Sequence, residues 1–163
     1  MLPSEVWANI TQWLKEILPQ CEVRRQYAPT DDLTQLASYE RPTIWAALGG
    51  IECEDVTTAG SVLADTYTIG LTLLWKVRDV NNPAELDTKI DTLQQLTNRI
   101  RQRKIDTPAG RLYIGAPNIT TVYDIDTLIA QSLLLSEVSL SVTNYSDRYY
   151  WDELDINGEN NST

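Results

Sequence analysis

The segment at 66–77 constrains the fold more than any other part of the sequence. Alternate positions along it are apolar, and mostly Thr, Gly and Leu lie between them. A two-residue period that includes Thr, Tyr and Trp is typical of a β-strand with one buried face. We therefore expect a strand here whose buried face carries Tyr67, Ile69, Leu71, Leu73, Trp75 and Val77.

A helix is expected at 82–104. Asn81 or Asn82 can cap it, and Pro83 suits its first helical position. Acidic residues come early in this segment and basic residues late, which complements the helix dipole. The buried stripe is expected to consist of Leu86, Ile90, Leu93, Leu96 and Ile100.

The remaining pattern predicts one more main helix and several strands. The helix is expected at 4–18, with Ser4 as its cap and Pro19 ending it. Gly49-Gly50 is interpreted as a hairpin turn or a bulge, and 28–42 as a loop or a helical excursion. Further strands are expected at 21–27, 43–48, 51–56, 111–115, 120–123 and 133–144.

This order of elements predicts the fold class. We expect an α+β fold in which two main helices pack on a mostly antiparallel sheet of about five or six strands. The chain has 163 residues, of which 42% are apolar, so a single domain at 1–145 is expected. The segment at 146–163 is acidic, lacks periodicity and is predicted to be a flexible tail.

The net charge of −10 limits the classes of partner. An acidic surface repels phosphate backbones, so DNA is expected at most to pass through an opening without adhering. No run of 18 apolar residues and no secretory signal is found, so neither a membrane span nor export is expected. The chain has no Phe but five Trp and eight Tyr, residues that suit partly exposed and interface positions.

The sequence offers little catalytic chemistry. It contains no His, which excludes Ser-His-Asp and Cys-His arrangements and His-ligated zinc. Cys21 and Cys53 are expected to be buried structural residues. Asp124 and Asp126 could hold a divalent cation if they shared one strand face. A second acidic group consists of Glu52, Glu54 and Asp55. For both groups, exposed surface positions are the preferred interpretation. No nucleotide-binding loop is present, so no enzymatic activity and no cofactor are predicted.

Two groups of residues are candidates for a partner interface. The first is the basic cluster of Arg99, Arg101, Arg103 and Lys104, which equally suits a helix C-terminus. The second is the aromatic run Tyr149-Tyr150-Trp151, because adjacent aromatic side chains in an acidic tail often anchor a partner.

The order of elements resembles the tail terminator (tail completion) proteins of long-tailed bacteriophages and prophages. The resemblance covers about 4–145 and rests on the order, length and character of the helices and strands, including Trp75-Lys76-Val77 and the strand ending at Val142. It implies a homo-oligomeric ring, a hexamer, that caps the tail tube and joins it to the head-tail connector protein. The resemblance also implies a location in the tail or neck of the virion, after assembly in the host cytoplasm.

Three alternatives stay open. A head-completion (neck) protein of similar size would act on the portal side, perhaps as a twelve-fold ring. A small acidic inhibitor or immunity-type module would bind a basic partner in a salt-sensitive manner. A metal-dependent enzyme would use Asp124 and Asp126.

Overall fold

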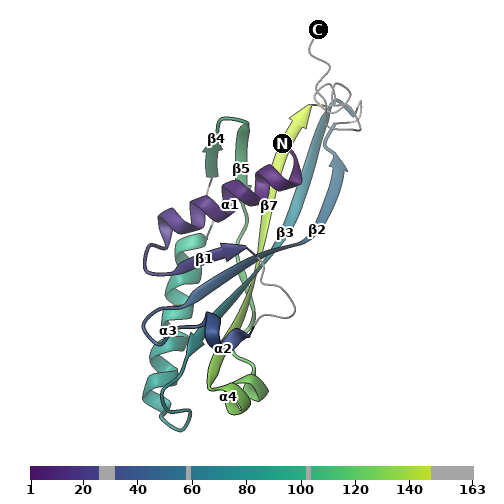
Figure 1. Ribbon diagram of the computed structural model, residues 1–163. Helices are drawn as coiled ribbons and strands as arrows, with labels where there is room; N and C mark the ends of the chain where they lie inside the picture. The colour runs from purple at the N-terminus through teal and green to yellow at the C-terminus, as the bar shows by residue number, and fades with distance from the viewer. Residues whose placement is uncertain (26–31, 58–59, 102–103, 148–163) are drawn as a thin grey trace.

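The computed structural model describes 1–25, 32–57, 60–101 and 104–147. These residues form four helices and seven strands (Figure 1). The helices are α1 (Pro3–Ile17), α2 (Leu33–Leu36), α3 (Pro83–Ile100) and α4 (Ile125–Gln131). The strands are β1 (Glu22–Arg25), β2 (Thr43–Asp55), β3 (Val62–Lys76), β4 (Lys104–Thr107), β5 (Gly110–Ile114), β6 (Asn118–Thr121) and β7 (Leu133–Asp147).

The strands form one sheet in the order β1-β2-β3-β7-β5-β4, with β6 paired to β7. Only β1 pairs in parallel, and all other pairs are antiparallel. The α+β class with a mostly antiparallel sheet is therefore confirmed. The 15-residue strand β3 spans about 50 Å, at about 3.3 Å per residue, and sets the length of the molecule.

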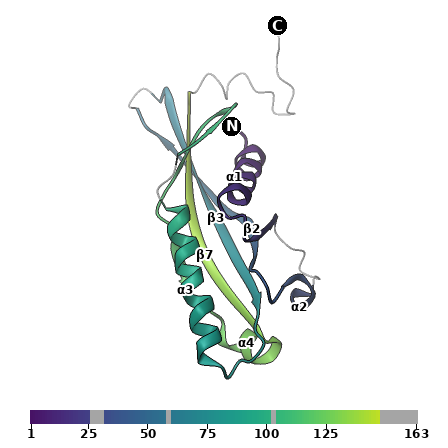
Figure 2. The ribbon, with the colours of Figure 1, turned by 90° about the vertical axis from the view of Figure 1, so that its left-hand side faces the viewer.

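The two long helices lie on one face of the sheet, which we call the helix face. Figure 2 shows α3 running along the long strands, with α1 nearer their upper half. Both helices contribute to one apolar core together with the alternate residues of β3 and β7, which confirms the two-residue period. On this face the buried strand residues include Tyr67, Ile69, Leu71, Leu73, Val138, Leu140 and Val142.

The opposite face, which we call the back face, is mostly polar. Its residues on β3 include Thr66, Thr68 and Thr72, and the hydroxyls of Thr66 and Thr143 are 3.0 Å apart. The short helix α2 covers only its lower end, where Trp45, Leu74 and Leu133 form a smaller apolar cluster. Above this cluster, Thr68 on the back face is exposed.

Several predicted boundaries were wrong by a few residues. Helix α1 begins at Pro3 with Leu2 as its N-cap, because Glu5 accepts a hydrogen bond from the Leu2 N–H at 2.5 Å and makes Ser4 unnecessary as a cap. Helix α3 ends at Ile100 and not at 104, because its apolar stripe stops there. The last strand, expected at 133–144, continues to Asp147.

Gly49-Gly50 does not end a strand. The chain continues through a β-bulge between Leu48 and Gly50, so that 43–48 and 51–56 belong to one strand, β2. Strand β4 and helix α4 were not predicted. No helix in the described part of the chain is both long enough and apolar enough to cross a bilayer.

Candidate assembly interface

The outer half of β2 is an exposed strand edge. Strand β1 pairs with β2 only from Thr43 to Ala46. Beyond that point no strand of the described residues pairs with β2 on this side, and 49–55 are exposed. The edge has two features that limit indiscriminate pairing, a bulge at Gly49 and the charges of Glu52 and Glu54. A Cβ on Gly49 would lie 3.3 Å from the Thr68 carbonyl oxygen, which favours glycine at the bulge.

The opposite edge of the sheet is β4. This strand forms a hairpin with β5, and Gly110 begins the return strand with φ +141°, a conformation that favours glycine. Ile105 packs against the core on the helix face. Lys104 is on the back face, with its Nζ 5.6 Å from the centre of the Tyr113 ring. The Arg111 Nε donates to Asp106 at 2.5 Å on that same face.

Residues that pair across successive strands form rows that cross the whole sheet, and the register places residues of the two edges in the same rows. One row runs from Lys104 through Tyr113, Thr143 and Thr66 to Glu52. The next row runs from Ile105 to Cys53 through Leu112, Asn144 and Asp65. The two edges therefore lie at the same height on opposite sides of the sheet, as Figure 1 shows for β4 and the outer part of β2.

An apolar groove of about 340 Å³ adjoins the β2 edge on the helix face. Its lining residues are Pro3, Ile51, Cys53, Leu63, Asp65 and Tyr67. Cys53 is exposed, contrary to the expected burial, because its strand projects beyond the helices. The hydrogen bond between the thiol and the buried Asp65 carboxylate raises the pKa of Cys53 above its ordinary value of 9.0, with burial and the charge of Asp65 adding to the effect.

Exposed apolar side chains gather at the two ends of the long sheet. At the hairpin end they are Leu2, Val56 and Tyr145, which we call the hairpin-end group. At the other end they are Val122, Tyr123, Ile125 and Ile129, which we call the α4 group, and Ile129 is 70% exposed. Figures 1 and 2 both show α4 at the end opposite to the tips of β2 and β3.

Only some residues of the predicted basic cluster lie at a helix C-terminus. Arg99 is in the last turn of α3 and Arg101 is its C-cap. Lys104 is instead the first residue of β4, so its expected place on a helix was wrong. Arg103 and the aromatic run Tyr149-Tyr150-Trp151 lie outside the described residues.

Asp124 and Asp126 do not share a strand face. Asp124 is the N-cap of α4, where its carboxylate accepts hydrogen bonds from the backbone N–H and the hydroxyl of Thr127, and Asp126 follows in the first turn. The hydroxyl bond is the main reason that the pKa of Asp124 is lowered. Among the described residues no group of three or more His, Cys, Asp or Glu side chains could hold a metal ion.

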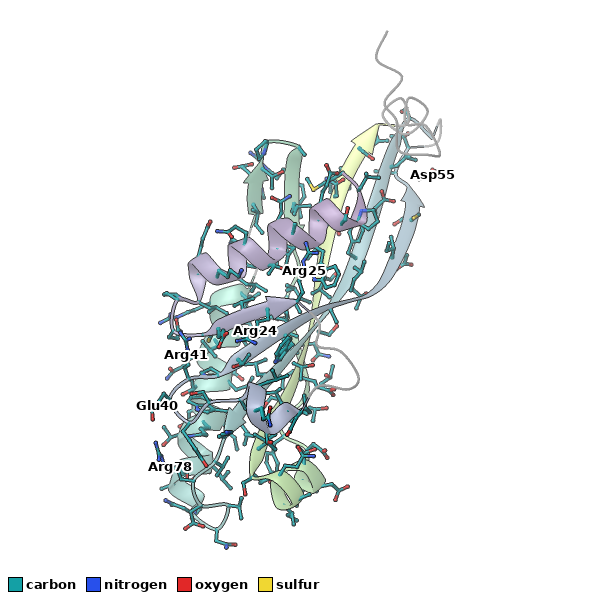
Figure 3. The ribbon with its side chains drawn as sticks, viewed as in Figure 1. Arg24, Arg25, Glu40, Arg41, Asp55 and Arg78 are labelled. Carbon is teal, nitrogen blue, oxygen red and sulfur yellow. The ribbon has the colours of Figure 1, made fainter. Side chains whose placement is uncertain are left out.

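Most of the arginines labelled in Figure 3 have partners within the chain. Arg24 pairs with Glu22 and stacks on Trp45, and Arg78 pairs with Glu40 at 3.0 Å. By contrast, no described cation forms an ion pair with Glu52 or Glu54. Figure 3 shows Asp55 at the far end of β2, away from these arginines. The β2 edge is therefore an acidic surface.

No protein-family model matches the chain, and no curated protein matches its sequence.

Proposed function

We propose that this protein is a structural assembly protein of a long-tailed bacteriophage or prophage. In this role it forms a ring that caps the tail tube and joins it to the head connector. The observation that carries the proposal is the presence of exposed apolar groups at the two opposite ends of a sheet about 50 Å long. Isolated exposed apolar residues are ordinary, but grouped ones typically mark contact surfaces.

Two further features support this role. A joining protein needs two contact surfaces that face away from each other, which the hairpin-end group and the α4 group provide. A ring subunit also needs lateral edges for its neighbours. No described strand pairs with the outer half of β2 or with the outer side of β4, and these two edges lie at one height. The net charge of −10 suits a ring through which DNA passes without adhering.

Deletion of the gene from its phage or prophage tests the proposal. A terminator deletion should leave filled heads and tails of uncontrolled length that do not join, and the intact gene should restore joined particles. Loss of a head-completion protein would instead leave tails of normal length beside heads that leak DNA. Particles of normal form and infectivity after deletion would contradict the proposal.

The acidic β2 edge also favours a second candidate, an inhibitor that binds a basic protein. Electrostatic attraction would make such a complex form quickly and weaken steeply with salt. A salt-resistant complex with a tail tube or connector protein would exclude this candidate, and a salt-labile one-to-one complex with a basic host protein would favour it.

A further inference from the structure

We propose that copies of this chain join head to tail through the two open sheet edges, with β4 of one copy pairing in parallel with the outer half of β2 of the next. The inference rests on the proposed function, because it supplies the lateral contact that a ring requires. It is carried by three properties of the edges, namely their direction, their register and the chemistry of each face.

Direction and register make the two edges compatible. Four successive antiparallel pairs separate β2 from β4, so the two strands run in the same direction. A neighbour that is turned so that its β4 lies along the outer half of β2 therefore pairs with it in parallel, and this turn also compensates the twist that accumulates over the four strand pairs. Since Lys104 and Glu52 lie in one row, that neighbour continues the sheet without a shift along the strands. Repeated head-to-tail contacts of this kind close into a ring when the rotation closes.

Each face of the junction has one complementary contact. On the back face, Lys104 of one copy meets Glu52 of the next, an opposite-charge pair on neighbouring strands. In the next row on this face Asp106 meets Glu54, a like-charge contact that opposes the junction, and Arg111 on β5 neutralises Asp106 from the inner side. A slip by one residue would exchange the two faces of the strand and lose this match.

On the helix face the contact is apolar. Ile105 of one copy meets Cys53 of the next, at the border of the groove lined by Ile51 and Tyr67. The groove is therefore covered when the neighbour docks, and the edge N–H and C=O groups find partners. The chain supplies both sides of the junction, so a second copy is the occupant we assign to this edge.

Cysteine crosslinking tests the junction with an Ile105→Cys variant, which places a new thiol beside the native Cys53 of the neighbour. Mild oxidation should give a ladder of disulfide-linked oligomers on a non-reducing gel, and Cys53→Ser should abolish it. Asp106→Cys is the matched control, because its thiol is on the back face and should not reach Cys53. If Ile105→Cys does not fold, a second pair of thiols can be placed two residues further along the same strands. This variant carries Thr107→Cys on β4 and Asp55→Cys on β2, with Cys53→Ser to remove the native thiol.

Charge exchange provides an independent measurement. Glu52→Lys or Lys104→Glu should raise the concentration needed for assembly by about tenfold or more, because each places like charges across the junction. The double variant Glu52→Lys/Lys104→Glu should restore assembly, whereas two unrelated surface changes would add their effects. If oligomers form but give no disulfide ladder, and if neither charge substitution changes the concentration needed for assembly, the proposed junction is wrong. The proposed role in the tail would be unaffected by that result. A chain that stays monomeric and never crosslinks would also overturn the junction, and the deletion phenotype would then decide the tail role separately.

Discussion

Lys104 and Glu52 stand in one row of the sheet, on the same face and at its two opposite edges. Three strands, β3, β7 and β5, separate these oppositely charged residues within one chain, so they cannot pair with each other. In the proposed junction they meet between two copies, Lys104 of one beside Glu52 of the next. A helix-backed sheet with complementary edges is thus suited to repetition around an axis.

The core on the helix face should dominate stability. Leu140 is fully buried between the helices and the sheet, so Leu140→Ala should lower the free energy of unfolding by about 2–5 kcal/mol. Ile129→Ala is the matched control, because this side chain is 70% exposed and should change stability by less than about 0.5 kcal/mol. Urea unfolding followed by Trp fluorescence measures both. Equal losses in the two variants would contradict the assigned core.

The thiol of Cys53 should react unusually slowly for an exposed cysteine. Its hydrogen bond to Asp65 stabilises the protonated thiol and raises its pKa, so less thiolate is present at a given pH. Asp65→Asn removes the negative charge and should move the rate profile for iodoacetamide to lower pH. The profile is measured in the Cys21→Ala background, and an unchanged profile would show that Asp65 does not control this thiol.

Alkaline pH should destabilise the fold through Cys21. Burial is the main cause that raises its pKa from 9.0 to about 11, so the folded protein keeps the neutral thiol while the unfolded chain ionises. The contribution of Cys21 to stability should therefore be present below about pH 9 and be lost as the pH rises toward 11. Thermal unfolding of the wild type and Cys21→Ala between pH 8 and 11 tests this, because the variant should lose stability less steeply. Parallel curves would contradict the assignment.

Asp124 should act as a helix cap and not as a metal ligand. Asp124→Ala should lower the midpoint of thermal unfolding, whereas Asp124→Asn, which can still accept the cap bond, should lower it less. Thermal shifts with and without Mg²⁺ or Mn²⁺ should be equal for the wild type. A specific metal-dependent shift that Asp124→Asn removes would favour the metal-dependent alternative.

The sequence predicted those elements whose periodicity is long and regular. The alternation around Ile69 and the apolar stripe ending at Ile100 identify the central strand and the main helix, because burial of one face imposes the period directly. Strand β4 was missed because only Ile105 in it packs against the core, and its pairing partner is set by tertiary structure. The role of Asp124 as a helix cap was missed because a DxD spacing is shared by strand faces and helix caps.

The candidate site was less predictable than the fold. Lys104 was found from its charge, but its place on a strand edge depends on the end of α3. The role of Glu52 depends on the bulge at Gly49, which turns two apparent strands into one long edge. A row that joins the two edges is a property of five strands in register, and no local sequence pattern records it.

Solution mass tests the central claim most directly. Light scattering coupled to size exclusion, with negative-stain images of the main peak, should give a ring of about six times the chain mass of 18.4 kDa. The mass should persist at high salt, because main-chain pairing and apolar contact accompany the ion pairs. A monomer at every concentration, with no ring in the images and no change when tail tube protein is added, would contradict the account.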